Sequence, residues 1–365
     1  MTTGKTTERV FITGNEACAE GAIAGGCRYF FGYPITPQNH IPEYMSEHLP
    51  EIGGVYVQAE SEVAAINMCI GAAAAGGIPM TSSSSPGVSL MQEGLSYLLG
   101  CELPCVVVNM VRGGPGLGNV LPAQSDYWLA TRGAGHGDGR CLTFAPWNLQ
   151  ELHDWTADSF EIAARYRLPV MILADAVLAT MMEPVRLRPR GKELTLDREW
   201  AVGGGLQGRE RRVINSLWVQ AEVMEAVNLR MAERFRRAEQ DMLRFEHFGD
   251  DEPDVLICAY GTMARVAQTA AEWVRDKGIR AAVFRPISLV PFPYAQLGEA
   301  AASAKRVLVV ELSLGQFIED VRLAVGERCP VEFIGRAGGA MIGPEDVADK
   351  IMSITSAEAG ASVGE

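Results

Sequence analysis

The stretch that decides the fold runs from Phe31 to Met68 and has the sequence FGYPITPQNHIPEYMSEHLPEIGGVYVQAESEVAAINM. It predicts a proline-rich turn, a helix, a strand over 55–58 and an alanine-rich helix over 60–75. Two carboxylates, Glu60 and Glu62, fall on the first turn of that second helix, where unpaired backbone N–H groups favour negative charge. Apolar residues follow them and would dock the helix on a sheet. We therefore expect the chemistry of this chain to centre on Glu60.

Strand and helix patterns alternate from Arg9 to Pro184. Continuous apolar runs such as 104–111 and 169–174 are typical of buried parallel strands. This alternation predicts a parallel sheet with helices on both faces. Loops that begin at Tyr33, Ser82 and Arg112 each follow a predicted strand. Because ligands bind at the carboxyl ends of such strands, we expect these loops to form one site.

The chain divides into two α/β units, so the predicted fold class is α/β with two doubly wound domains. We expect the first domain over 1–185 and the second over 254–354. Between them, 186–253 predicts a charged, glycine-rich linker followed by a long helix over 213–245. The small-residue segment 355–365 is expected to be a disordered tail.

Composition excludes several functions. The formal net charge of −13 and the lack of a basic cluster argue against nucleic-acid binding. The N-terminal segment lacks an apolar core and no window is long enough to span a membrane, so we expect a cytoplasmic protein.

Eight scattered cysteines indicate buried free thiols in a reducing compartment. The pair in CELPC (101–105) lacks the spacing of a zinc or iron–sulfur site, so we expect no metal on this chain.

A glycine-rich loop, RGGPGLGN, follows a predicted buried strand at 112–119. Its glycines allow the backbone to approach a ligand, and Arg112 has the geometry to hold a carboxylate with two hydrogen bonds. Thr36, between Pro34 and Pro37 in YPITP, offers a hydroxyl to the same anion. For both segments the alternative is a purely structural turn.

Five segments together resemble a known family: GYPITP (32–37), VQAESEVAAINMCIGAAAAG (57–76), TSSSSPGVSLMQEGLSYL (81–98), ELPCVVVNMVRGGPGLGN (102–119) and RLPVMILADAVLATMMEP (167–184). They look like the alpha subunit of 2-oxoacid:ferredoxin oxidoreductases, and most like the branched-chain 3-methyl-2-oxobutanoate (2-oxoisovalerate) group. The resemblance covers nearly the whole chain, except 185–245.

The resemblance implies a division of labour. The alpha subunit supplies the pyrimidine-binding domain of a thiamine diphosphate site and a transketolase C-terminal-like domain. A beta subunit holds the diphosphate with Mg²⁺ and a [4Fe-4S] cluster, while gamma and delta subunits contribute coenzyme A binding and further clusters. The implied reaction is oxidative decarboxylation of a 2-oxoacid with CoA to acyl-CoA and CO₂. Electrons pass to ferredoxin or another acceptor.

The resemblance also assigns site residues. The glutamate of the family's Q-x-E motif falls on Glu60, which would be buried and hydrogen-bond the aminopyrimidine of the cofactor. Glu62, two residues along the same helix, is expected to point elsewhere. Thr36 and Arg112 would hold the substrate carboxylate. The remaining cofactor-binding residues would be Pro34, Ser85 and Gly87.

A second motif concerns the diphosphate. Gly137-Asp138-Gly139 matches the GDG that opens the magnesium–diphosphate signature of thiamine diphosphate enzymes, but Asn148 comes far too early to complete it. We expect a turn there, and we favour a structural role for His136 beside it over a catalytic one.

Several alternatives remain open. Within the class, the substrate could be 2-oxoglutarate or an aryl 2-oxoacid such as phenylglyoxylate. The chain could instead be a non-catalytic assembly subunit. A nucleotide-dependent dehydrogenase is disfavoured because no dinucleotide fingerprint follows a strand.

Overall fold

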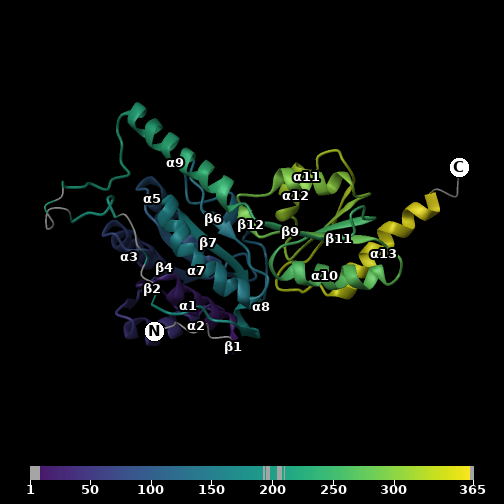
Figure 1. Cartoon of the computed structure of the whole chain (residues 1–365), viewed down its shortest axis with the longest axis horizontal. Helices are drawn as coiled ribbons and strands as arrows, with labels where there is room; N and C mark the ends of the chain where they lie inside the picture. The colour runs from purple at the N-terminus through teal and green to yellow at the C-terminus, as the bar shows by residue number, and fades with distance from the viewer. Residues whose placement is uncertain (1–8, 192–193, 195–197, 204–207, 209, 362–365) are drawn as a thin grey trace, which may run out of the picture.

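The computed structural model describes residues 9–191, 194, 198–203, 208 and 210–361. Two α/β lobes lie side by side, and each is built on its own sheet (Figure 1). The predicted fold class is confirmed. None of the described helices is both long enough and apolar enough to cross a membrane.

The first lobe contains a seven-stranded sheet in the order β12-β6-β7-β5-β4-β2-β3. All of its strands run parallel except β12, which pairs antiparallel with β6. The strands are β2 (Tyr29–Gly32), β3 (Val55–Gln58), β4 (Pro79–Ser83), β5 (Cys105–Val111), β6 (Leu142–Phe144), β7 (Pro169–Asp175) and β12 (Ser288–Val290). Beside them, β1 (Val10–Thr13) and β8 (Met182–Val185) form an antiparallel pair.

Helices cover this sheet because the connections between parallel strands must cross its faces. They are α1 (Gly14–Gly25), α2 (His40–Glu51), α3 (Glu62–Ala74), α4 (Pro86–Leu90), α5 (Gln92–Gly100), α6 (Tyr127–Thr131), α7 (Leu149–Tyr166) and α8 (Ala176–Thr180). Strands β4, β5 and β7 are buried along their whole length, as the apolar sequences of β5 and β7 predict.

The second lobe has a five-stranded sheet in the order β14-β13-β10-β11-β9. Its strands are β9 (Phe245–Gly249), β10 (Val255–Cys258), β11 (Ala281–Pro286), β13 (Val307–Glu311) and β14 (Val331–Gly335), with β9 antiparallel to β11. Helices α10 (Gly261–Arg275) and α13 (Pro344–Ala361) lie on one face, and α11 (Tyr294–Ala302) and α12 (Phe317–Val325) on the other (Figure 1).

The lobes share a core and are not merely tethered. One apolar cluster runs from the first lobe into the α11/α12 side of the second, through the packed rings of Tyr127, Tyr260 and Phe317. A buried ion pair also joins them: both terminal nitrogens of Arg285 on β11 donate to Glu151 on α7, at 2.9 and 2.8 Å. The site loops of the first lobe therefore lie against a fixed neighbour.

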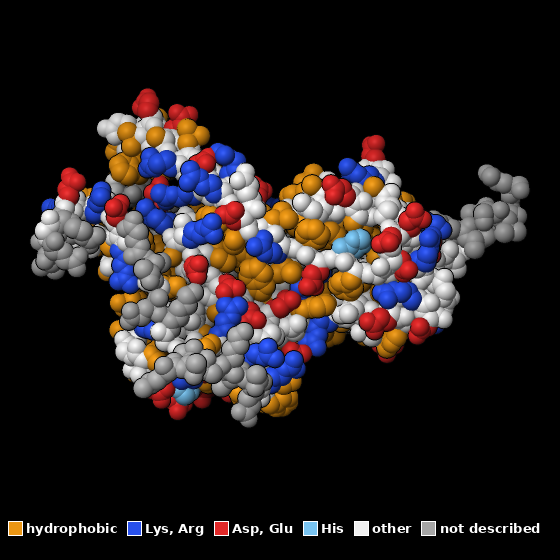
Figure 2. Space-filling model, in the orientation of Figure 1, with side chains coloured by type: hydrophobic (Ala, Val, Ile, Leu, Met, Phe, Trp, Pro, Cys, Tyr) orange, Lys and Arg blue, Asp and Glu red, His pale blue; other side chains and the backbone are white. Residues whose placement is uncertain are grey.

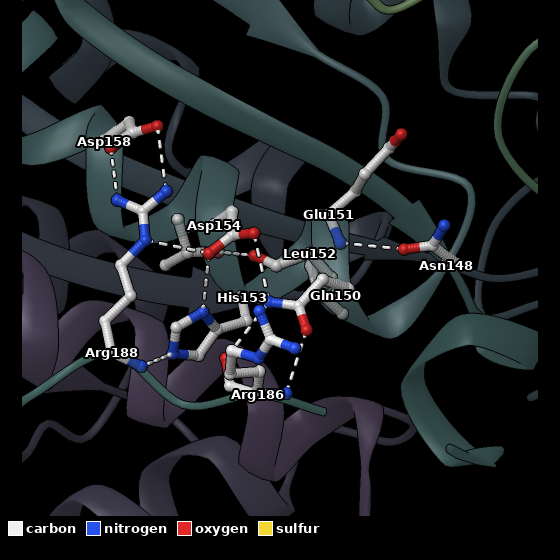
Figure 3. Close-up of polar contacts among 10 residues, drawn as sticks. Asn148, Gln150, Glu151, Leu152, His153, Asp154, Asp158, Arg186 and Arg188 are labelled. Carbon is white, nitrogen blue, oxygen red and sulfur yellow. Dashed lines mark hydrogen bonds and ion pairs between the residues drawn. The ribbon is translucent and has the colours of Figure 1, made fainter. Parts of the chain in front are cut away.

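The chain that leaves β8 is fastened to α7 (Figure 3). The Gln150 amide donates to the carbonyl of Arg186 at 3.1 Å and accepts from its N–H at 2.8 Å. Nε2 of the buried His153 accepts from the backbone N–H of Arg188 at 3.3 Å, so Nδ1 carries the proton toward Asp154 at 3.1 Å. These contacts make His153 a structural residue and hold the start of the linker in an extended conformation.

Three local predictions differ from the structure. The long helix, α9 (Ala221–Met242), begins at Ala221 and not at 213, because both the side-chain oxygen and the amide nitrogen of Asn215 hydrogen-bond to the backbone of Leu217 and so compete with helix formation. Strand β9 falls in the predicted linker but pairs with β11. Helix α13 continues to Ala361 through the expected tail, whose alanines favour a helix.

Candidate active site

Loops from four parallel strands meet at the carboxyl edge of the seven-stranded sheet, as predicted. The loop after β2 is tied to β4 by Gln38, which accepts from the Ser82 hydroxyl at 2.5 Å and donates to the Tyr33 carbonyl at 2.9 Å. Asn15 reaches the same loop and donates to the carbonyl of Pro37 at 2.8 Å. The YPITP segment is therefore held in place by buried polar side chains.

Glu62 is a buried carboxylate at this edge. It is the first residue of α3, follows the N-cap Ser61 and is 4% exposed. The hydroxyl of Ser83, at the end of β4, donates to its Oε1 at 3.0 Å. A carboxylate on the first turn of a helix is favoured by the free N–H groups there. The fold thus holds one oxygen of Glu62 by a fixed donor at the ligand-binding edge.

The prediction that Glu60 is the buried carboxylate on the helix is wrong. Glu60 lies before the N-cap Ser61, outside α3, and its side chain is exposed. The Ser61 hydroxyl accepts from the backbone N–H of Ala64, which starts the helix one residue after Ser61. Because Ser61 is the N-cap, Glu60 lies outside the helix, whereas Glu62 is its first residue and is buried.

Gly87, on α4, packs directly against this carboxylate. A Cβ at this position would lie 2.2 Å from Oε1 of Glu62 and 2.0 Å from the Ser83 hydroxyl. No side chain fits there without displacing Glu62. The absence of a side chain lets the Glu62 carboxylate and the Ser83 hydroxyl pack against the backbone of α4.

Ser85 connects the β4 loop to β5 and has an unusual backbone conformation, with φ of 26°. Its N–H donates to the Oδ1 of Asn109 at 3.1 Å, and its hydroxyl accepts from the N–H of Arg112 at 3.0 Å. Asn109 in turn donates to Asp126 at 2.9 Å. Burial raises the pKa of Asp126, although its hydrogen bonds with Asn109 and Ser85 oppose this. Hydrogen bonds from Ser85 to Asn109 and from Arg112 to Ser85 therefore hold this strained turn in place.

Arg112 and Thr36 are brought together as predicted, but through the backbone. Nη1 of Arg112 donates to the carbonyl of Thr36 at 2.8 Å, and Nη2 donates to the carbonyl of Leu117 at 3.1 Å. The side chain is 6% exposed, and its buried Nε has no partner in the described part of the chain. Thr36 and Pro34 are exposed. Arg112 therefore locks the glycine loop to the YPITP loop and keeps donor capacity for a ligand.

The second lobe braces the glycine loop. Asn119 donates to the carbonyl of Gly338 at 2.9 Å. Gln124, farther along, donates to the carbonyl of Tyr260 at 2.9 Å and accepts from the N–H of Leu312 at 3.0 Å. These contacts hold the segment after Arg112 against the second lobe.

Sequence reasoning missed several residues that build this edge: Gln38, Ser83, Asn109 and Gln124. Asn109 did leave a signal, because it is the one polar residue in the apolar strand CVVVNMV. A polar side chain buried in a strand needs a partner, and its partners are the site loops. Gln38 and Gln124 carry no such local signal. In the described residues, no group of three or more His, Cys, Asp and Glu could hold a metal ion.

Comparison with known families agrees with this architecture. The family described as "Pyruvate flavodoxin/ferredoxin oxidoreductase, thiamine diP-bdg" matches residues 20–241, and "Pyruvate:ferredoxin oxidoreductase core domain II" matches residues 253–347. The chain is an alpha subunit of the 2-oxoacid:ferredoxin oxidoreductase family. The family's first domain covers the whole edge that holds Glu62, Ser85 and Arg112.

Individual proteins that are similar to this alpha subunit support the same family assignment. The ketoisovalerate oxidoreductase subunit VorB of Methanothermobacter thermautotrophicus is 43% identical over 94% of the chain and 97% of its own length. A 2-oxoglutarate:ferredoxin oxidoreductase from Magnetococcus marinus, solved with 2-oxoglutarate, coenzyme A and succinyl-CoA, has a TM-score of 0.82 at 27% identity. That match covers 95% of this chain and 65% of the other. A split-gene transketolase shares the fold at a TM-score of 0.59 and 16% identity, over 94% of this chain and 97% of the other.

Proposed function

We propose that this alpha subunit works in a thiamine diphosphate-dependent complex that oxidatively decarboxylates a branched-chain 2-oxoacid with CoA. The products are the acyl-CoA and CO₂, and the electrons pass to ferredoxin. The observation that carries the proposal is the buried Glu62 carboxylate beside Gly87, in a domain of the thiamine diphosphate-binding family.

The residues present fit the aminopyrimidine half of this cofactor. When bound, thiamine diphosphate supplies the carbon nucleophile that attacks a 2-oxo group. Glu62 would hold a proton between its carboxylate and a ring nitrogen, while the Ser83 hydroxyl keeps the carboxylate oriented. Gly87 and Ser85 would lie against the ring, and Pro34 beside it. This gives Glu62 the role expected for Glu60, because burial and a fixed donor are what the role needs.

The substrate carboxylate would bind near Arg112 and Thr36. The Arg112 guanidinium keeps donors beyond the two that its neighbours' carbonyls use, and its buried Nε is one of them. The Thr36 hydroxyl, on the residue whose carbonyl Arg112 contacts, would be a second donor to the same carboxylate. A fixed guanidinium suits a planar carboxylate better than a flexible ammonium would.

Partner subunits complete the site. Large apolar side chains are exposed around this edge, which favours cover by another chain; they are Tyr33, Val63, Leu117, Val120, Leu121 and Leu314. The relatives are themselves named as subunits. We propose a beta subunit that holds Mg²⁺, the diphosphate and a [4Fe-4S] cluster, with gamma and delta subunits for CoA and further clusters. A cytoplasmic location stays a prediction.

The branched-chain substrate rests on similarity. The ketoisovalerate subunit is 43% identical, whereas a 2-oxoglutarate synthase subunit KorA from Methanothermobacter marburgensis is 33% identical. Both matches cover nearly the whole chain. A small apolar side chain is therefore favoured over a second carboxylate, and the aryl acids remain the main alternative.

The test is a substrate panel on the natively purified complex, following viologen reduction with 2-oxoisovalerate, pyruvate, 2-oxoglutarate or phenylglyoxylate. The matched control omits CoA. We expect CoA-dependent reduction with a clear preference for 2-oxoisovalerate. A preference for 2-oxoglutarate or phenylglyoxylate would overturn the substrate assignment and leave the reaction class in place. If the complex contains thiamine diphosphate and clusters, inactivity with all four acids would contradict the assigned substrate class.

A further inference from the structure

The amino edge of the seven-stranded sheet, opposite to Glu62 and Arg112, carries a second polar cluster. Glu102 precedes β5 and Arg167 precedes β7, and both have left-handed backbone conformations, with φ of 54° and 51°. Nε of Arg167 donates to the carbonyl of Glu102 at 2.9 Å. Because β5 has seven residues, this cluster lies roughly 20 Å from the carboxyl edge.

Arginines outnumber carboxylates there. Helix α9 crosses this edge and brings Arg230 and Arg234 to Glu102, at 3.4 and 2.9 Å, while a nitrogen of Arg167 lies 3.8 Å from the same carboxylate. Figure 2 shows Lys and Arg side chains gathered along the part of this face that α9 crosses. One buried nitrogen of Arg234 has no hydrogen-bond partner in the described part of the chain. A single Glu102 thus contacts three guanidinium groups.

The cluster borders a cavity of about 350 Å³. Its walls come from the end of α5, the linker and α9, and include Trp200, Arg212 and Trp218. Arg167, Arg212 and Arg230 line this cavity together with the carboxylates Glu102 and Glu199, so the lining keeps an excess of positive charge. Burial and then the charge of Arg234 lower the pKa of Arg167, and the charge of Glu102 opposes them. The volume is within the range of small-molecule sites.

We propose that this cavity binds a nucleotide, with its phosphates on Arg212 and Arg230 and its base on Trp218. Guanidinium groups bind phosphate through paired, directional hydrogen bonds, and a tryptophan ring is a stacking surface for a base. The indole of Trp200 is committed elsewhere: its Nε1 donates to the carbonyl of Ala73 at 3.1 Å, and Arg167 covers its face at 5.4 Å. An acidic peptide would use the arginines but not the exposed ring of Trp218.

The experiment is calorimetric titration of the purified complex with ADP, and in parallel with adenosine and with inorganic phosphate. We expect saturable ADP binding, with each fragment at least roughly tenfold weaker, because neither makes both sets of contacts. Arg212→Ala and Trp218→Ala should each weaken ADP binding by roughly tenfold or more, since each removes a direct contact. Both side chains are exposed, so these variants should fold.

The matched control is Arg237→Ala, which removes the same charge from α9 but pairs with Glu233 outside the cavity. It should leave ADP binding unchanged. The absence of saturable ADP binding would overturn the proposal. Phosphate binding as tight as ADP binding would show an anion site without base recognition and would also overturn it. ADP binding that coenzyme A displaces and Arg212→Ala does not change would place the nucleotide elsewhere.

Discussion

The two edges of the seven-stranded sheet use charge differently. At the carboxyl edge, Glu62 and Arg112 are almost fully buried and are held by short hydrogen bonds from neighbouring loops. At the amino edge, Arg230 and Arg234 reach Glu102 from α9, and their side chains are partly exposed. The first arrangement fixes individual atoms, whereas the second collects positive charge around a cavity. Catalysis requires side chains held in fixed positions, as at the carboxyl edge. Anion binding is compatible with the positive charge collected at the amino edge.

The largest effect should come from the two glutamates of the β3–α3 loop. Glu62→Gln keeps the shape but removes the charge that holds a proton, so turnover should fall by roughly 10²- to 10⁴-fold. Glu60→Gln is the matched control and should keep near-normal activity, because Glu60 is exposed and precedes the helix. The measurement is CoA-dependent viologen reduction in complexes with equal thiamine diphosphate content. The reverse outcome would restore the original prediction for Glu60.

Gly87→Ala tests the space beside the carboxylate. The added methyl group would lie 2.2 Å from Glu62 and 2.0 Å from Ser83, so one of them must move. Overpacking of this size should raise the thiamine diphosphate concentration for half-maximal activity by roughly tenfold or more. Gly71→Ala on α3 is the control, since nothing lies within 4 Å of its Cβ position. Equal cofactor affinity in the two variants would remove Gly87 from the site.

Arg112→Lys sharpens the role of the fixed cation. Lysine keeps the charge but cannot bond to the carbonyls of Thr36 and Leu117 together with a planar carboxylate. We expect KM for the 2-oxoacid to rise by roughly tenfold with a smaller change in kcat. Arg265→Lys, which pairs with Glu183 away from this edge, is the control. An unchanged KM in Arg112→Lys would mean that Arg112 only holds the two loops together.

The sequence predicted most of the fold because strands β5 and β7 are continuous apolar runs and the helix that leads into β7, α7, is 18 residues long. It also predicted that the loops at Tyr33, Ser82 and Arg112 meet, since parallel strands end at one edge. It did not predict β12, which joins the first sheet from the second half of the chain. Strand β12 has only three residues, and its partner β6 is far away in the sequence. So short a segment gives too weak a pattern to be assigned to the first sheet.

The error at Glu60 has a physical cause. Both glutamates are close to the helix start, and the sequence alone does not say which residue caps it. Once Ser61 is the N-cap, Glu62 is the first helical residue and meets Ser83, a contact between residues far apart in the sequence. The side-chain contacts of Gln38, Asn109 and Gln124 are equally nonlocal, so they appear only after the strands are placed.

The second lobe repeats the charge cluster of the amino edge on a smaller scale. Asp254 precedes β10 and contacts Lys305 at 2.9 Å and Arg280 at 3.1 Å. Burial raises its pKa, but the hydrogen bonds from Lys305 and Arg280 outweigh this and lower it to about 2. A carboxyl group whose pKa is lowered by folding stabilises the protein above its unfolded pKa of about 4 and loses that contribution as the pH falls.

Asp254→Asn should therefore lower the Tm of the complex modestly near neutral pH, because the ion pairs of Asp254 are partly exposed. The difference from the wild type should shrink as the pH falls from about 5 toward 3, since the unfolded chain then binds a proton at Asp254 that the folded carboxylate, with a pKa of about 2, does not bind. Thermal unfolding across this range measures it. Glu252→Gln is the control, because it only approaches Arg280, at 3.9 Å, from an exposed position. If the difference in Tm between Asp254→Asn and the wild type stayed constant with pH, Asp254 would act through packing and not through its charge. The charge clusters at the amino edges of the two sheets would then be alike in position only.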